Sequence, residues 1–287
     1  MDFYTAALLQ GLGYAAMGLG IFISLKIFNI PDITTDGSYT LGGVITAVGL
    51  VSGWHPLLTL LFAIAGGVGA GIATGLIHTK LKVNSLLAGI LVMTALYSVN
   101  LGIMGRPNIP LMNVNSIFEL LPASESMNME LIVFLLTVFL LVAALYYLLH
   151  TDFGIAMRAT GNSERMVRAM GINTGVMMIT GLALANGLTA ISGFLLVQYQ
   201  GFADINMGIG IVISGLASVM IGEAIAKMFN INKILLQLIL VVAGSILFRL
   251  ILAGALSSGL NPNYLKLVTA SLVLVVLVLT KFKRSRS

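Results

Sequence analysis

Polar side chains suited to contact a solute gather at two interruptions of an otherwise apolar sequence. The first interruption, residues 30–37, reads IPDITTDG, and the second, residues 202–208, reads FADINMG. Each combines carboxylates or amides with glycine or proline and leads into a stretch of small residues. Interrupted helices at matching places in two halves of a membrane protein are typical of an inverted repeat around a central pathway. The pattern predicts a pathway lined by polar residues from both interruptions: Thr34, Asp36, Ser38, Asp204 and Asn206.

These polar groups also have a purely structural alternative, which is to cap the ends of broken helices. The sequence alone leaves both roles open for each residue. Three amides within apolar stretches are weaker candidates for the pathway: Asn100, Asn186 and Gln198.

Arg249 is a further pathway candidate, because it is a basic residue in the middle of an apolar stretch. A charge in lipid costs several kcal/mol unless it is paired or reaches water. Three arrangements would relieve that cost. Arg249 could pair with Asp204, extend to the membrane interface, or bind the carboxylate of a solute. The first arrangement is our expectation, and the other two stay open.

Several kinds of chemistry are excluded by missing motifs. No lysine follows a glycine, so the chain lacks the phosphate-binding loop of ATPases. The absence of cysteine excludes disulfides and thiolate ligands. The histidines His55, His78 and His150 are far apart, and no HExxH zinc motif occurs. We therefore expect no catalytic residue, no metal and no cofactor on this chain.

The elements that position the candidate residues follow from composition. Hydrophobic residues make up 58% of the chain and charged residues 9%, with a mean hydropathy of +1.04. A soluble domain carries about 25% charged residues, so most of this surface must face lipid. Nine apolar stretches approach the roughly 20 residues that span a bilayer as a helix: 5–26, 38–53, 56–78, 84–104, 131–149, 175–197, 208–226, 234–256 and 262–280. We predict an all-α polytopic membrane protein with an inverted repeat and about nine, between eight and ten, transmembrane helices.

The basic residues predict the orientation in the cell membrane, because cytoplasmic loops are rich in lysine and arginine. With nine spans, one side holds only Arg106 and Lys266. The other side holds most of the basic residues: Lys26, Lys80, Lys82, Arg158, Arg165, Arg168, Lys227, Lys233 and those of the tail 281–287. We expect the N-terminus outside and the C-terminus in the cytoplasm. The same bias explains the net charge of +5 without nucleic acid as a partner.

The longest loop on the basic side, residues 151–174, predicts a short surface helix over residues 161–169. Glu164 and Arg168 are spaced for an ion pair along a helix, and Gly171 is a typical helix terminator. Three apolar residues would give this helix a docking patch: Met166, Val167 and Met170.

Two runs in this segment carry a family resemblance, RATGN at residues 158–162 and GIN at residues 171–173. Their spacing resembles the cytoplasmic signature of permease subunits in the ATP-binding-cassette (ABC) importer family that includes branched-chain amino acid and sugar uptake systems. The chain departs from that signature at Met166 and Val167, where the family has small residues. Residues 31–38, PDITTDGS, are similar to the subgroup that takes up tryptophan or tyrosine.

The resemblance implies a single transmembrane permease domain over residues 1–287, in which residues 151–174 dock on a separate cytoplasmic ATPase. The docking residues would match or adjoin the signature: Arg158, Gly161, Asn162, Glu164, Arg165, Arg168 and Gly171. ATP would bind and be hydrolysed on the ATPase, so this chain would be a transport subunit and no enzyme. An extracellular or periplasmic solute-binding protein and a second permease copy, as a homodimer, are the other implied partners.

The resemblance favours an amino acid, above all an aromatic one, as the imported small solute. Nucleosides, sugars and aliphatic amino acids stay open. The alternative function is an ion- or proton-coupled secondary transporter, which needs a titratable or cation-binding group deep in the membrane. The alternative for residues 151–174 is a solvated basic loop without a partner.

Overall fold

The computed structural model describes residues 3–112, 114–119, 129–259, 261 and 264–284. Its helices are α1 Phe3–Ile21, which continues as the π-helix η1 Phe22–Ile27, then α2 Thr34–Val51, α3 Pro56–Lys80, α4 Ser85–Met104, the 3₁₀ helix η2 Ile117–Glu119, α5 Met129–His150, α6 Asp152–Asn162, α7 Glu164–Ala169, α8 Thr174–Gln200, α9 Ile211–Met228, α10 Ile234–Ser257 and α11 Leu265–Arg284. Two short strands accompany them, β1 Asn108–Pro110 and β2 Phe202–Asp204.

Each of the nine predicted apolar stretches contains a helix, which confirms an all-α polytopic membrane protein. Within the described residues, seven helices are long and apolar enough to cross a membrane: α1 with η1, α3, α4, α5, α8, α9 and α10. The first half of α2 is too polar to be among them, and α11 has a shorter apolar part, Leu265–Val278. Nine spans are therefore not confirmed.

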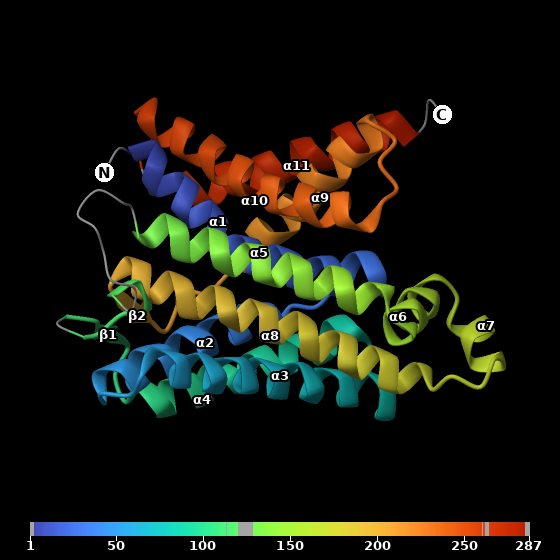
Figure 1. Cartoon of the computed structure of the whole chain (residues 1–287), viewed down its shortest axis with the longest axis horizontal. Helices are drawn as coiled ribbons and strands as arrows, with labels where there is room; N and C mark the ends of the chain where they lie inside the picture. Colours follow the sequence, from blue (N-terminus) through green and yellow to red (C-terminus); the bar gives the residue numbers. More distant parts are fainter. Residues whose placement is uncertain (1–2, 113, 120–128, 260, 262–263, 285–287) are drawn as a thin grey trace.

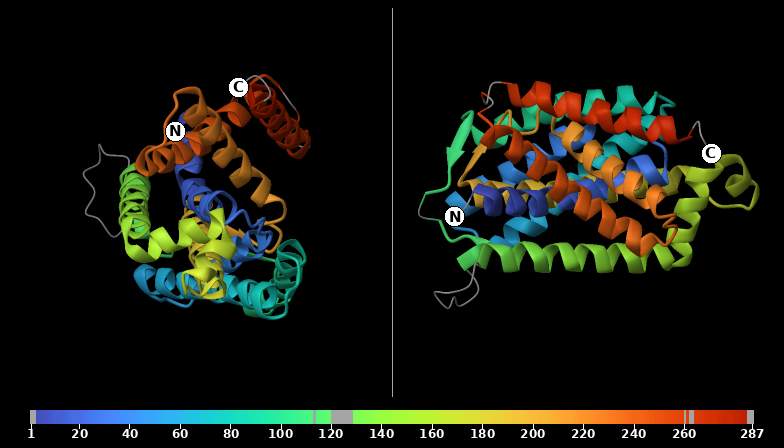
Figure 2. Two further views of the ribbon diagram at one scale, coloured as in Figure 1. Left: turned by 90° about the vertical axis from the view of Figure 1, so that its right-hand side faces the viewer. Right: turned by 90° about the horizontal axis from the view of Figure 1, so that it is seen from above.

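The helices form an elongated bundle in which α1 and α8 are central (Figure 1). Both are buried along most of their length, whereas less than a third of the apolar stretch of α4, α5 and α10 is buried. Helices α2, α3 and α4 lie on one side of this centre, and α9, α10 and α11 lie on the other (Figures 1 and 2). The exposed faces carry large apolar side chains such as Leu61, Leu91 and Phe139. A face of this kind is stable against lipid and not against water.

Small residues allow the central helices to pack closely, as the four-residue glycine spacing on α3 predicts. A Cβ atom at Gly67 would lie 2.5 Å from the carbonyl oxygen of Asn186, and one at Gly75 would lie 2.8 Å from the Cα atom of Ile179. Both neighbours belong to α8. Gly67 and Gly75 therefore serve helix packing against α8.

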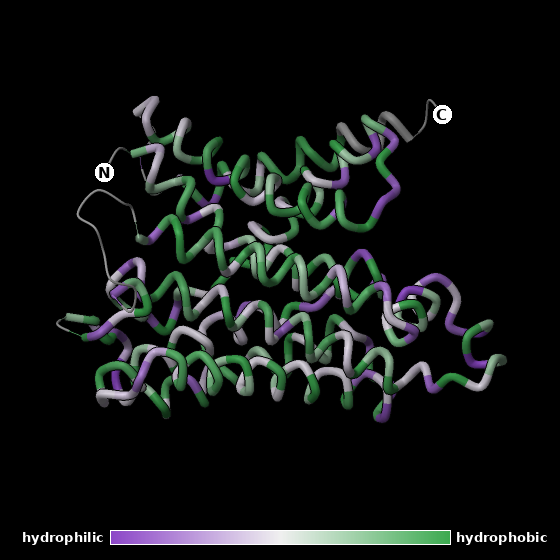
Figure 3. Tube along the Cα trace, viewed as in Figure 1, coloured by the Kyte–Doolittle hydropathy of each residue, from purple (hydrophilic) through white to green (hydrophobic). Residues whose placement is uncertain are grey.

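The two ends of the bundle differ. At one end α1 begins and β1 pairs antiparallel with β2, with Asn108 opposite Asp204 (Figure 1). At the other end α6 and α7 project beyond the bundle as a hairpin rich in hydrophilic residues (Figure 3). The segment between α4 and α5 contains β1 and η2, while its residues 113 and 120–128 lie outside the described part.

Candidate functional site

The two interrupted segments meet inside the bundle, although 170 or more residues separate their contacting groups. The Asp36 carboxylate accepts hydrogen bonds from the backbone N–H groups of Gly210 and Val212, each at 2.8 Å. These groups belong to the open N-terminus of α9, where a negative charge is favourable. Gly208 lies against the Asp36 carbonyl, a position that a side chain would obstruct. Asp36 therefore holds the start of α9 against the start of α2.

The segments approach this junction from opposite ends of the bundle. The first leaves η1 at Ile27, which contacts Gly161 of α6. The second turns back from β2 at the opposite end (Figure 1). An inverted repeat of the whole chain stays a prediction.

Asp32 anchors a buried polar network that connects α2 to α8. Its carboxylate accepts from the Thr34 backbone N–H at 2.9 Å and from Asn186 Nδ2 at 2.7 Å. Ser38 Oγ donates to Asn186 Oδ1 at 2.6 Å, and the Thr34 and Thr74 hydroxyls share a hydrogen bond of 2.7 Å. All of these side chains are buried. Each polar contact is made within the chain, as a membrane interior requires.

Sequence reasoning did not select Asp32 or Thr74 for the site. A signal was present for Asp32, since an aspartate two residues before a helix start commonly accepts from that backbone N–H. No local signal pointed to Thr74, which reaches Thr34 only because α3 packs beside α2. Asn186, rated as a weaker candidate, lies at the centre of the network.

The predicted pathway residues divide into an inner and an outer group. Thr34, Asp36 and Ser38 lie together inside the bundle. Asp204 lies at the β1–β2 end, where it accepts from the Asn206 backbone N–H at 2.8 Å and from Asn108 Nδ2 at 3.4 Å. The structure therefore does not bring Asp204 and Asn206 to the inner group.

Arg249 does not pair with Asp204, so that expectation is wrong. The Arg249 guanidinium lies over the ring of Tyr14, with its Cζ atom 3.7 Å from the ring centroid. Tyr14 in turn stacks on Tyr39, with centroids 5.9 Å apart and planes inclined by 19°. The expectation failed because α10 packs against α1, which places an aromatic face where a carboxylate was expected.

The other two amides also make contacts within the chain. Asn100 Nδ2 donates to the Gly37 carbonyl at 3.4 Å, while its Oδ1 atom is buried without a hydrogen-bond partner. Gln198 accepts from the Ile117 backbone N–H at 2.8 Å and donates to the Phe194 carbonyl at 3.0 Å. Gln198 therefore fastens η2 to α8.

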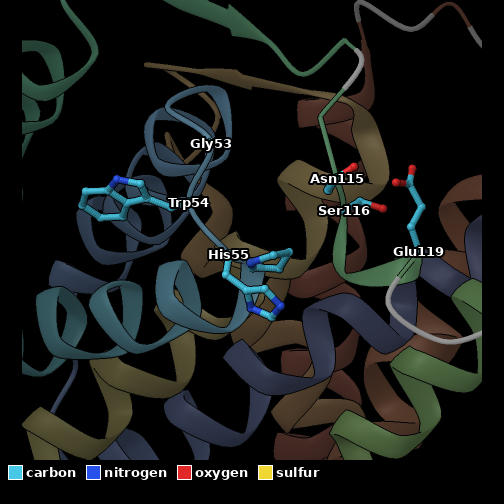
Figure 4. Close-up of a pocket in the computed structure, with 7 residues that line it drawn as sticks. Gly53, Trp54, His55, Asn115, Ser116 and Glu119 are labelled. Atoms are coloured by element: carbon cyan, nitrogen blue, oxygen red, sulfur yellow. The ribbon is translucent and has the colours of Figure 1, made fainter.

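A surface pocket of about 440 Å³ lies between the α2–α3 turn and the segment that leads into η2 (Figure 4). Its lining combines aromatic, amide and acidic side chains: Gly53, Trp54, His55, Pro56, Asn115, Ser116 and Glu119. None of the predicted pathway residues lines this pocket.

The loop over residues 151–174 folds as two helices, so the single helix expected over residues 161–169 needs correction. Gly161 and Asn162 belong to the end of α6, and the chain is extended at Ser163 before α7 begins. The Thr151 side chain accepts from Gly154 N–H at 3.2 Å and thereby caps α6. A side chain at Gly161 would collide with the Ile27 carbonyl. This contact seats α6 on the end of η1.

Helix α7 carries three of the charged residues of the predicted docking segment, Glu164, Arg165 and Arg168. Glu164 and Arg168 form an ion pair, and both contact the Thr174 hydroxyl, at 3.1 and 3.3 Å. Arg165 is exposed, and Gly171 ends the helix region with a φ of +84°. The predicted apolar patch is split, because Val167 is buried whereas Met166 and Met170 are 61% and 71% exposed. Arg158 on α6 has a buried Nε atom without a hydrogen-bond partner.

An ion-paired triad connects η1 to the far end of α9. Lys26 Nζ lies 2.6 Å from Glu223 Oε1, and Lys227 Nζ lies 2.9 Å from the same oxygen. Lys26 precedes Ile27, the residue on which α6 is seated. The hairpin, η1 and α9 are therefore in continuous contact.

Comparison with known proteins gives a consistent family. The family model described as branched-chain amino acid transport system / permease component matches residues 3–278. A tyrosine transport system permease protein of Clostridioides difficile is 38% identical over 96% of this chain and 91% of its own length. A galactofuranose transporter permease protein of Escherichia coli is 25% identical over 92% of this chain and 75% of its own length.

A ribose import permease protein of Escherichia coli is likewise 25% identical, over 94% of this chain and 82% of its own length. No solved structure shows a significant match. The matches cover the helical bundle, both interruptions and the α6–α7 hairpin together. This chain belongs to the branched-chain amino acid transport system permease family.

Proposed function

We propose that this chain is the membrane-spanning permease subunit of an ATP-driven importer whose energy comes from a separate ATPase. Membership of a permease family supports this function. The sequence has no phosphate-binding loop, so ATP hydrolysis requires another subunit. The α6–α7 hairpin is the docking element, because it projects from the bundle with exposed Arg165, Met166 and Met170.

The observation that carries the proposal is the chain of contacts from the hairpin to the junction of the interrupted segments. Gly161 touches Ile27, Lys26 pairs with Glu223, and the other end of α9 is held by Asp36. A displacement of the hairpin by an ATPase would reach α9 and could release its N-terminus from α2.

We assign the β1–β2 end to the outside and the α6–α7 end to the cytoplasm. The enrichment of lysine and arginine on the hairpin side supports this orientation. The outer end would receive solute from an external binding protein. A second copy of the permease would complete the pathway.

The solute class we propose is an amino acid, with an aromatic side chain favoured. Support comes from the relative named as a tyrosine permease. Relatives named for ribose and galactofuranose make a neutral sugar the competing class. L-Tyrosine is therefore the first solute to test.

Uptake of radiolabelled L-tyrosine tests the proposal in cells that express this chain with its ATPase and binding protein. Replacing the phosphate-loop lysine of the ATPase should abolish uptake, while a protonophore applied with cellular ATP maintained should have little effect. The reverse result would establish an ion-coupled secondary transporter. That alternative stays in the test because Asp32 and Asp36 are carboxylates inside the bundle.

A further inference from the structure

We propose that Arg249, Tyr14 and Tyr39 form the site that recognises the carboxylate of the imported solute. This inference deepens the proposed function and rests on it. The three residues come from α10, α1 and α2 and form one continuous stack, guanidinium on ring and ring on ring. They are called the Arg249 stack below.

The residues of the Arg249 stack on α1 and α10 lie well inside two membrane-spanning candidate helices and away from the helix ends. Helices α1 and α10 run antiparallel, and Tyr4 Oη lies 3.4 Å from Ser257 Oγ where α1 begins and α10 ends. Arg249 is eight residues from Ser257, and Tyr14 is ten residues from Tyr4. At about 1.5 Å per residue these positions are about 12 and 15 Å from the helix ends. The apolar core is about 30 Å thick, so a bundle that spans it would hold both backbone positions inside the core.

The positive charge of Arg249 has no ion-pair partner among the described residues. Its Nε atom is buried without a hydrogen-bond partner, while the side chain as a whole is partly exposed. A guanidinium offers five N–H donors in a planar fork that fits both oxygens of a carboxylate. Contact with Tyr14 compensates only part of the cost of this charge.

The stack is adjacent to the junction of the interrupted segments. Tyr39 follows Asp36 by three residues on α2, which is about one helical turn. Transporters commonly bind anionic solute groups at such broken helices near the membrane centre. The N–H groups of Gly210 and Val212 at the start of α9 already bond to Asp36. Arg249 is a cationic group beside this junction that has no ion-pair partner among the described residues, so it can receive the solute carboxylate.

This arrangement separates the two competing solute classes. An amino acid brings a carboxylate for Arg249. Neutral sugars such as ribose bring no carboxylate. Arg249 is thus a specificity-determining residue for amino acids over sugars.

Uptake kinetics with radiolabelled L-tyrosine test this role in cells that contain the whole importer. Arg249→Gln should raise KM or lower the maximal rate at least about tenfold, because the bond to a charged group is lost. Arg249→Lys keeps the positive charge but lacks the planar fork of donors, so its kinetic constants should lie between those of the wild type and Arg249→Gln. Lys266→Gln removes an exposed positive charge from the start of α11 and should match the wild type. Membrane abundance of each variant is measured by immunoblot.

Wild-type kinetics in Arg249→Gln would overturn the inference while leaving the proposed function intact. If Arg249→Gln is not inserted, wild-type kinetics in Arg249→Lys would overturn it equally. A wild-type importer that carries neutral sugars and no carboxylate-bearing solute would refute the proposed solute class, and this inference with it.

A cysteine at position 249 separates solute contact from a structural role, because the native chain has no cysteine. Aminoethyl methanethiosulfonate should restore a positive charge and tyrosine uptake in Arg249→Cys. The anionic reagent sulfonatoethyl methanethiosulfonate should not restore tyrosine uptake. Saturating L-tyrosine should slow the modification several-fold, whereas ribose should not. Modification at the same rate with and without tyrosine would contradict solute contact.

Discussion

Removal of the Asp36 carboxylate should detach the start of α9 from α2. The carboxylate accepts two backbone N–H groups, from Gly210 and Val212. Hydrogen bonds to a charged group contribute about 1.5–3 kcal/mol each, so Asp36→Ala should cost about 3–6 kcal/mol. Asp36→Asn keeps one acceptor oxygen of similar geometry and should cost about half as much.

Thermal unfolding of the purified chain in mild detergent measures this effect. A change of 1 kcal/mol shifts Tm by about 2–4 °C in a chain of this size class, so Asp36→Ala should lower Tm by at least about 6 °C. Thr46→Val is the matched control on the same helix. It removes a buried hydroxyl that bonds only to the Gly42 carbonyl one turn away, and its cost should stay within about 1 kcal/mol.

Equal Tm values for Asp36→Ala and Thr46→Val would refute the capping role of Asp36. Asp36→Asn as harmful as Asp36→Ala would show that charge alone, and not the paired acceptor geometry, holds α9.

Three further predictions concern the hairpin, the ion pair of Glu223 and the orientation. Gly161→Ala should displace α6 from the Ile27 carbonyl and reduce copurification of the ATPase, whereas Gly69→Ala, which meets open space on α3, should behave as wild type. Glu223→Gln should leave stability within about 1 kcal/mol, since the ion pair is partly exposed, yet it should lower tyrosine uptake per ATP hydrolysed, and an unchanged ratio would argue against transmission through α9. In sealed cells an impermeant thiol reagent should label Ser257→Cys but not Lys80→Cys or Arg165→Cys; labelling of Lys80→Cys would overturn the orientation, and Ser124→Cys, also expected to be labelled, lies outside the described residues.

The long helices were predictable because each depends on local sequence. Apolar stretches bounded by proline, asparagine or glycine gave every long helix, and Gly171 stopped the α7 region as expected. Helix α6 was missed because its stabilising contact, Gly161 on Ile27, joins residues more than 130 positions apart. The spacing of residues within 151–174 cannot indicate that contact, because Ile27 lies outside this segment.

The sequence indicated several residues of the site, but it did not indicate which groups those residues contact. Thr34, Asp36 and Ser38 were selected as polar groups in an interruption, and they do lie together. The partner of Asp36 is a pair of backbone N–H groups, which no side-chain pattern reveals. Arg249 was correctly identified as a charge in need of compensation, but the choice among a carboxylate, water and an aromatic ring depends on which helix packs against α10.

The most direct test of the central claim uses proteoliposomes that contain this permease and its ATPase, with the binding protein added outside. We predict that radiolabelled L-tyrosine accumulates inside only when ATP is enclosed in the liposomes, and that no ion or proton gradient replaces ATP. Accumulation driven by a gradient in the absence of ATP, or ATP hydrolysis that never moves an amino acid, would contradict the account.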